Sequence, residues 1–404
     1  MKKRRLFLSG LKQSMRDSTL GIGQLLIIGF DGTEMSPRLA SLLGKIQPAG
    51  VILFARNIEG AEQTHALLRE CQKQVATPLF TCVDLEGGTV DRFRKALGAA
   101  PSPAEVFATG SRALFRKHGS VIGENCRALG FNVNFAPVLD LTRQASRSVL
   151  SSRAVSEDPK RVVVYAREFL TGLRDAGVLG CGKHFPGLGE GNLDSHHELP
   201  VIEKPLKKMW AEDIYPFRML RAAMPFVMVS HAAYPQVTAD PTPASLSKKW
   251  ITDILRKKVG YNGLIASDDL EMGAVLKFAP IEEIAVRHIR AGGNLALICH
   301  QEEMIVRAYE ALVREVERDR RFATCVDEAV KRNQRMRKKL LGVFLKGKGP
   351  SRSAPKAERL SRRLWEFGEE VRLATVGRGA DRQADHLTDY RTDYRKTASK
   401  KERG

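Results

Sequence analysis

Short apolar runs recur along this chain, and between them apolar residues return every three or four positions. The short runs are rich in β-branched and aromatic residues, as buried strands are, whereas the intervening stretches have the period of amphipathic helices. This alternation predicts parallel βαβ units. Eight strands are expected, over Leu25–Phe30, Gly50–Phe54, Leu79–Val83, Asn132–Pro137, Val178–Lys183, Phe226–Ser230, Leu264–Ser267 and Asn294–Cys299.

The residues that follow these runs favour a closed barrel, although a doubly wound sheet would also fit the alternation. In (β/α)8 barrels the active site is assembled at the C-terminal ends of the strands. A purely structural role would not put charge at the same end of so many strands. The fold class predicted is therefore α/β, as a single (β/α)8 barrel of the TIM type. Polar, reactive residues close nearly every run: Asp84, Asp140, Lys183, His184, His231, Asp268, Asp269 and His300.

The barrel domain is predicted to span residues 20–345 and to be completed by two amphipathic helices within Ile305–Leu341, broken near Asp319–Ala323. Residues 1–19 form an N-terminal lead segment, and residues 346–404 a basic, partly disordered C-terminal extension. One helical face of the extension has the spacing needed to pack on the barrel. It consists of Leu360, Leu364, Trp365 and Phe367.

Composition narrows the class of protein. Of the 404 residues 43% are hydrophobic, ample for a large core, but no apolar run approaches the roughly 18 residues of a membrane-spanning helix. The N-terminal segment lacks the apolar stretch of about 7–15 residues found in secretory signals. The six cysteines are scattered, without the paired spacing of zinc sites. We expect a cytoplasmic protein with reduced thiols, no membrane span, no metal and no cofactor.

The formal net charge of +20 leaves two interpretations of the extension open. A basic tail can attract nucleic acid, anionic lipid or an acidic polymer, and it can equally be a solvated segment that keeps the protein soluble. The extension lacks aromatic interleaving of the kind that stacks bases, and no nucleic-acid motif is recognised in the chain. No dedicated nucleic-acid partner is expected.

The segment 183–197 carries the most chemistry. It reads Lys-His-Phe-Pro-Gly-Leu-Gly-Glu-Gly-Asn-Leu-Asp-Ser-His-His and follows a predicted strand. Its glycines favour a tightly turning loop. Asp194 and His196 stand two residues apart, and a carboxylate that orients a histidine is a common general acid/base. A surface loop that happens to hold two histidines is the alternative, and His197 is expected to be a bystander.

Several segments together resemble glycoside hydrolase family 3, and within it the single-domain bacterial β-N-acetylglucosaminidases. The resemblance covers about residues 20–345 in the family's order and spacing, leaves out the extension, and implies a (β/α)8 fold. The segments that carry it are Gly23–Leu25, Gly50–Asn57, Asp84–Gly88, Asn134–Asp140, Lys183–Gly187, Asp194–His196 and Ser267–Leu270.

The resemblance implies roles for individual residues. Asp268 matches the nucleophile, and His196 matches the general acid/base, with Asp194 holding its ring. The implied activity is that of a retaining exo-β-N-acetylglucosaminidase, active as a monomer on cell-wall muropeptides. Residues matched to binding of the N-acetylglucosamine hydroxyls and acetamide are Asp84, Arg92, Arg153, Lys183 and His184, with His231 at the rim.

Elementary chemistry agrees with these roles. Retaining glycoside hydrolysis needs a nucleophilic carboxylate and a proton donor for the leaving oxygen. A histidine titrates near neutral pH and can serve as that donor in place of a second carboxylic acid. Structural alternatives exist for four of these residues. Asp268 could cap a helix, as could Asp269; Lys183 and His184 could be a buried pair; Arg153 could pair with Glu157 or Asp158.

Three departures from the family pattern leave the substrate open. The family commonly has a polar residue where Leu85 stands, arginine where Thr89 stands, and histidine where Leu188 stands. The competing functions are a related family 3 β-glycosidase or glycoside phosphorylase, a sugar-binding protein without activity, and a nucleic-acid-associated protein. The leaving-group saccharide is not specified by the sequence.

Overall fold

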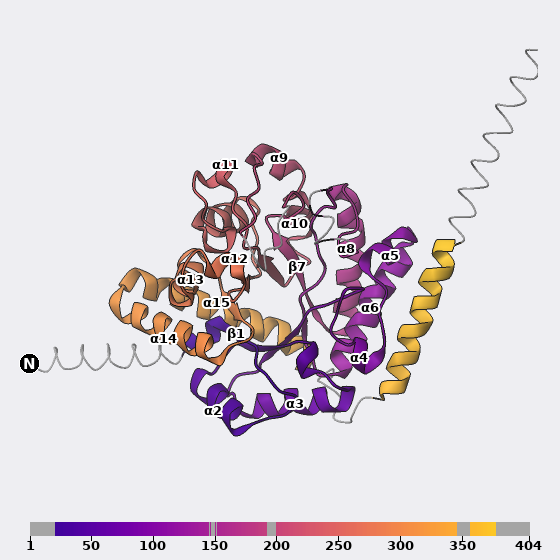
Figure 1. Cartoon of the computed structure of the whole chain (residues 1–404), viewed down its shortest axis with the longest axis horizontal. Helices are drawn as coiled ribbons and strands as arrows, with labels where there is room; N and C mark the ends of the chain where they lie inside the picture. The colour runs from indigo at the N-terminus through magenta and orange to yellow at the C-terminus, as the bar shows by residue number, and fades with distance from the viewer. Residues whose placement is uncertain are drawn as a thin grey trace, which may run out of the picture.

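The computed structural model describes residues 21–376, except 145, 147–149, 151, 192–198 and 346–355 (Figure 1). Eight parallel strands close into a barrel in the order β1-β10-β9-β8-β7-β6-β3-β2. The predicted barrel is confirmed, and each strand overlaps its predicted run. The strands are β1 (Leu26–Ile28), β2 (Gly50–Leu53), β3 (Phe80–Val83), β6 (Val133–Asn134), β7 (Leu179–Phe185), β8 (Phe226–Val229), β9 (Leu264–Asp269) and β10 (Leu295–Ile298).

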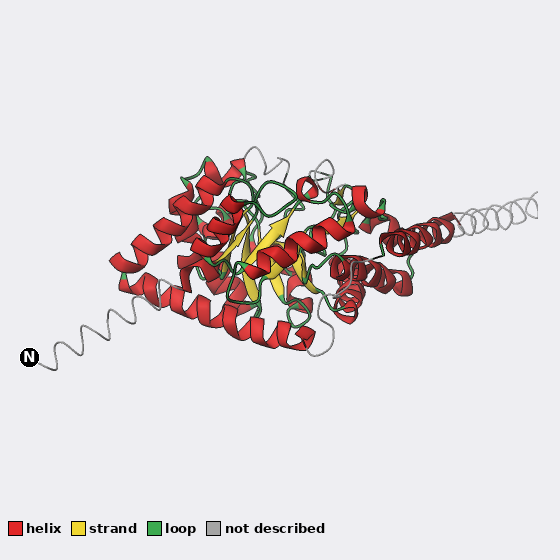
Figure 2. Cartoon of the chain, turned by 90° about the horizontal axis from the view of Figure 1, so that it is seen from below, coloured by secondary structure: helices red, strands yellow, loops and turns green. Residues whose placement is uncertain are grey.

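Helices surround the strands on all sides (Figure 2). The predicted break near Asp319 is confirmed, because α14 ends at Arg318 and α15 begins at Arg320. No helix in the described part of the chain is both long and apolar enough to cross a membrane. The helices are α2 (Pro37–Ile46), α3 (Ala61–Lys73), α4 (Arg94–Leu97), α5 (Pro103–Ala108), α6 (Arg112–Ala128), α8 (Pro159–Ala176), α9 (Leu206–Ala211), α10 (Tyr215–Leu220), α11 (Pro235–Thr238), η4 (Lys249–Lys258), α12 (Gly273–Leu276), α13 (Ile281–Arg290), α14 (Glu302–Arg318) and α15 (Arg320–Leu345), with short turns at η1 (Gly23–Leu25), η2 (Ala55–Asn57) and η3 (Ala244–Leu246).

The strands are apolar on both faces because each face is buried against a different layer. Alternate strand residues point into the barrel and form one cluster, which includes Ile52, Phe80, Phe226 and Met228. The remaining strand residues pack outward against the helices in a second, larger cluster. This two-sided burial explains why the strands read as continuous apolar runs.

Helix α15 closes the N-terminal end of the barrel. The Arg337 guanidinium donates to Oε1 of Gln24 at 2.5 Å and lies 5.1 Å from the centre of the Phe80 ring. The Asn333 amide donates to the backbone carbonyls of Gln24 and Asn294. The other end of the barrel, at the C-terminal ends of the strands, is not covered by α15 and contains the candidate active site.

A small antiparallel hairpin, β4 (Leu85–Gly87) and β5 (Val90–Asp91), lies beside the barrel and was not expected. Its turn uses Gly87 and Gly88 at φ values of 93° and 63°, which glycine adopts without strain. The Asn134 amide exchanges two hydrogen bonds with the backbone of Leu85, at 2.9 and 2.8 Å. This pair of bonds fixes the hairpin to the end of β6.

Residues 357–376 of the C-terminal extension form a helix that packs along α6 (Figure 1). Leu364, Phe367 and Val371 are buried in the contact, and Leu360 is half-buried. Trp365 is 67% exposed, so its predicted place on the packing face is wrong. Neighbouring residues differ by about 100° around a helix, so a face that buries Leu364 turns Trp365 outward.

Candidate active site

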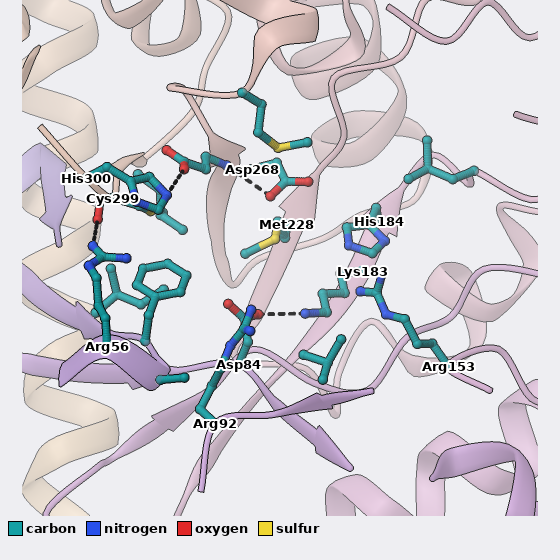
Figure 3. Close-up of a pocket in the computed structure, with 18 of the residues that line it drawn as sticks. Arg56, Asp84, Arg92, Arg153, Lys183, His184, Met228, Asp268, Cys299 and His300 are labelled. Atoms are coloured by element: carbon teal, nitrogen blue, oxygen red, sulfur yellow. Dashed lines mark hydrogen bonds and ion pairs between the residues drawn. The ribbon is translucent and has the colours of Figure 1, made fainter. Parts of the chain in front are cut away.

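A cavity of about 450 Å³ opens at the C-terminal ends of the strands (Figure 3). Its floor is the apolar interior of the barrel, contributed by Ile52, Met228 and Leu297. Five of the six predicted sugar-binding residues line it together with Asp268. The polar lining residues are Arg56, Asp84, Arg92, Arg153, Lys183, His184, Asp268, Asp269 and His300.

One wall of the cavity is a network of two acids and two cations. The Lys183 ammonium donates to Oδ1 of Asp84 and to Oε1 of Glu86, both at 2.7 Å. The Arg153 guanidinium donates to both carboxylate oxygens of Glu86, each at 2.8 Å. Only 1% of the Glu86 side chain is exposed. Glu86 therefore ties Arg153 to Lys183 and sets the position of both.

Electrostatics keep Glu86 and Lys183 charged in this network. Burial alone would raise the pKa of the Glu86 carboxyl, but Arg153 and Lys183 outweigh it and hold that pKa well below its ordinary range. Burial would lower the pKa of Lys183, yet Asp84 and Glu86 hold it above its ordinary value. The cavity wall thus presents fixed cationic donors beside a carboxylate.

Two alternatives raised by the sequence are resolved by this network. Lys183 does form a buried ion pair, but with acids at the ends of β3 and in β4 rather than with His184. Arg153 pairs with the buried Glu86 and not at the surface with Glu157 or Asp158. Glu86 received no role from the sequence. The available signal was an acid inside an apolar and glycine-rich segment directly after a strand-end aspartate.

His184 is oriented by a second buried acid, Asp140. Its Nδ1 lies 2.7 Å from Oδ2 of Asp140, which also accepts a bond from the His184 backbone N–H at 3.2 Å. The other Asp140 oxygen accepts from the Leu188 backbone N–H at 2.7 Å. Asp140 therefore fixes the imidazole plane and holds the start of the following loop against β7.

Asp268 lies at the C-terminal end of β9, one residue before its last, and projects into the cavity opposite Asp84 and Lys183 (Figure 3). Its Oδ1 accepts a bond from the backbone N–H of Asp269 at 2.9 Å. Burial alone would raise the pKa of the Asp268 carboxyl. The imidazoles of His184 and His231 and the amide of Asp269 outweigh burial, so this pKa lies below its ordinary value. Asp268 is an ionised carboxylate at the cavity surface.

Asp268 does not cap a helix. The next helix, α12, has Met272 at its N-cap position. Asp269 makes the local turn instead, because its Oδ1 accepts from the backbone N–H of Glu271 at 3.0 Å. The Asp268 side chain is thereby left for the cavity.

His231 follows β8 but lies behind the cavity wall, so the predicted position at the rim is corrected. Its Nδ1 is 2.7 Å from the Ser245 hydroxyl, and its Nε2 is 2.8 Å from the backbone carbonyl of Asp269. The residue is 1% exposed, and burial lowers its pKa. Both ring nitrogens are engaged, which makes His231 a support for the end of β9.

The far wall is aromatic and cationic, and of its residues only Arg92 was predicted to bind the sugar. The His300 ring stacks on Phe54 with centroids 5.4 Å apart, and its Nε2 lies 3.2 Å from Oδ2 of Asp269. The Arg56 and Arg92 guanidiniums lie 4.8 and 5.4 Å from the centre of the Phe54 ring. This wall faces His184 and Arg153 across the cavity (Figure 3).

The predicted general acid/base His196 and its partner Asp194 lie outside the described residues. The chain on either side of them is held by one buried cation. The Lys204 ammonium, 1% exposed, binds Glu190 at 2.9 Å, Glu212 at 2.8 Å and Asp213 at 2.6 Å. Glu190 precedes the segment 192–198 and Lys204 follows it, so this cluster joins the two ends of that segment.

Within the described residues, no group of three or more histidine, cysteine or acidic side chains is arranged to hold a metal ion. The three departures from the family pattern fall in different places. Leu85 is buried in the core, Thr89 is exposed, and Leu188 lines the cavity.

We predict that Glu86→Gln destabilises the fold by about 3–5 kcal/mol at pH 7, because it removes the buried carboxylate that pairs with Arg153 and Lys183 and leaves Arg153 without its buried partner. Folding lowers the pKa of Glu86, so its contribution is complete above the unfolded value of about 4.3 and declines as pH falls below it. The gap between wild type and variant in urea unfolding should therefore shrink from pH 5 toward pH 2.

Glu366→Gln is the matched control, because the Glu366 carboxylate is exposed and paired with Arg362 on one helix. Exposed pairs contribute at most about 1 kcal/mol. A gap for Glu86→Gln that stays constant down to pH 2 would show that the ionised carboxylate is not what stabilises the network.

Comparisons with known proteins agree with this geometry. Residues 19–336 match the Glycosyl hydrolase family 3 N terminal domain. A protein named Beta-hexosaminidase from Alkalilimnicola ehrlichii is 38% identical over 287 residues, which are 69% of this chain and 82% of that protein.

Solved structures give the same result. A family 3 β-N-acetylglucosaminidase from Paenibacillus sp. superposes with a TM-score of 0.77 at 31% identity, covering 86% of this chain and 68% of that one. A β-N-acetylhexosaminidase from Beutenbergia cavernae gives 0.72 at 25% identity, covering 79% and 97%. The match to the domain spans more than half of the chain, and the family resemblance seen in the sequence is confirmed. The chain belongs to glycosyl hydrolase family 3.

Proposed function

We propose that this chain is a retaining exo-β-N-acetylglucosaminidase that acts through a covalent glycosyl-aspartate on Asp268. The observation that carries the proposal is an ionised Asp268 facing the Asp84–Lys183–Glu86–Arg153 network across one cavity. The names of the relatives, β-hexosaminidase and β-N-acetylglucosaminidase, support the choice of sugar.

In the first step the Asp268 carboxylate attacks the anomeric carbon and forms an ester, while the glycosidic bond breaks. His196 gives a proton to the departing oxygen, with Asp194 orienting the imidazole. In the second step His196 takes a proton from water, which attacks the anomeric carbon and releases Asp268. Two inversions at the same carbon give net retention.

The network supplies orientation. Arg153 and Lys183 offer directional donors, and Asp84 offers an acceptor, to the hydroxyls and the acetamide of one sugar ring. Because Glu86 and Asp140 hold these groups in place before substrate arrives, little ordering is required on binding. His184 stands beside them with its ring fixed by Asp140.

The shape of the cavity supports removal of a terminal residue. Its floor is formed by Met228 and Leu297 of the barrel core, so a saccharide can enter only by one end. We propose muropeptide fragments of the cell wall as substrates and a monomer in the cytoplasm as the working form. The buried free thiols, among them Cys82, Cys126 and Cys181, suit a reducing compartment.

A panel of aryl β-glycosides tests the proposal. Release of the aryl group should be fastest from the N-acetylglucosaminide and should not depend on added phosphate, whereas Asp268→Asn should be inactive on all. A rate that requires phosphate would identify a glycoside phosphorylase, in which a neutral histidine avoids repelling the incoming anion. Binding of N-acetylglucosamine without any release would identify a sugar-binding protein.

A further inference from the structure

We infer that the helix 357–376 of the C-terminal extension is a positioning element of the active site, with Phe367 holding the β4–β5 hairpin in place through His118. The inference rests on the proposed function only where it assigns sugar binding to Lys183 and Arg153. The extension lies outside the part of the chain that matches the family.

The helix makes two contacts with the residues behind the hairpin. The Phe367 side chain is fully buried and stacks on the His118 imidazole of α6, with ring centroids 5.7 Å apart and an angle of 24°. The neighbouring Gly368 faces Pro101, since a β-carbon at that glycine would lie 3.9 Å from Cγ of the proline. Ion pairs Lys117–Glu370 and Arg363–Glu124 join the same helix to α6.

His118 and Pro101 in turn abut the turn of the hairpin. A β-carbon on Gly87 would lie 2.1 Å from the Pro101 carbonyl oxygen and 3.4 Å from Nε2 of His118. A β-carbon on Gly88 would lie 2.5 Å from that of Ser102. The turn therefore rests on these residues without spare room, and a shift in them displaces it.

Only one of the two ring nitrogens of His118 makes a hydrogen bond within the described residues. Its Nδ1 lies 2.9 Å from the Tyr165 hydroxyl, whereas its Nε2 has no hydrogen-bond partner within the described part of the chain. The Phe367 ring covers one face of the imidazole, and Phe169 meets it edge-on at 5.1 Å. Loss of the Phe367 ring would uncover the face that the helix now shields.

The hairpin carries the residue on which the sugar-binding cations depend. Glu86 precedes Gly87 directly and accepts bonds from both Arg153 and Lys183. Movement of the turn would shift Glu86 and so misplace both donors at the cavity wall. The path from the extension to the site is thus Phe367, His118, Gly87 and Glu86.

The test compares Phe367→Ala with Trp365→Ala in the full chain. Trp365 lies on the same helix but faces solvent, so it controls for changes in the helix itself. Phe367→Ala should raise KM for the aryl N-acetylglucosaminide about 10-fold and change kcat less than about 3-fold, because binding of the ring is loosened. Hydrogen exchange of residues 85–102 should speed up in the same variant, and neither quantity should change in Trp365→Ala.

Phe367→Leu keeps an apolar side chain and is the test variant to use if Phe367→Ala does not stay folded. It should show a smaller rise in KM and in exchange. Wild-type protein without activity on any glycoside would overturn the proposed function, while the exchange measurement would still test the helix. Active wild type with normal KM and normal hairpin exchange in both Phe367 variants would overturn the inference.

Discussion

Replacing Asp268 by asparagine should reduce turnover of aryl β-N-acetylglucosaminides by about 10⁴-fold or more, as loss of a covalent nucleophile does elsewhere. Asparagine keeps the size of the side chain and can still accept the bond from the Asp269 amide, but its amide oxygen is a poor nucleophile. The loss should therefore appear in kcat with little change in the unfolding midpoint.

Asp269→Asn is the control for this variant, because Asp269 makes the local turn and contacts His300 rather than presenting a free carboxylate. It should lose much less activity. Losses of equal size in the two variants would mean that the end of β9 acts as a structural unit and that Asp268 has no special role.

Replacing His196 by alanine should slow natural disaccharides by about 10²–10⁴-fold, the usual contribution of general acid catalysis. Aryl glycosides with very acidic leaving groups need no proton and should be affected less at the glycosylation step. The measurement is kcat/KM across leaving groups of graded acidity, with His197→Ala as the adjacent control. Equal losses over the whole series would assign His196 a structural role.

The barrel strands were predictable because parallel strands are buried on both faces, which makes β2 and β8 continuous apolar runs. The hairpin was not, because β4 and β5 have only three and two residues and so show no period. One of those residues, Glu86, is charged, and a charged residue predicts an exposed position although Glu86 is buried.

The candidate site was predictable as a set of strand-end residues but not as a network. Lys183 and Asp84 are 99 positions apart, and Arg153 and Glu86 are 67 apart, so only the closure of the barrel brings them together. The same limit applies to His231, whose position behind β9 depends on Ser245 and on the Asp269 backbone.

The basic composition of the extension made its apolar packing face difficult to predict. Its many basic residues point to a solvated tail, yet within residues 357–376 Leu364, Phe367 and Val371 recur at spacings of three and four and are buried on α6. The spacing was visible in the sequence, whereas the partner surface on His118 was not.

The central claim is a covalent intermediate on Asp268, and trapping it tests that claim most directly. A fluorinated N-acetylglucosaminide with an acidic leaving group should form the glycosyl ester with Asp268. The fluorine should also slow hydrolysis of that ester, so that the intermediate accumulates. Mass spectrometry of peptides from the wild-type protein should then find one sugar on Asp268, and none in Asp268→Asn. A label on Asp269 or Glu271, or active enzyme that releases the inverted sugar and is never labelled, would contradict the account.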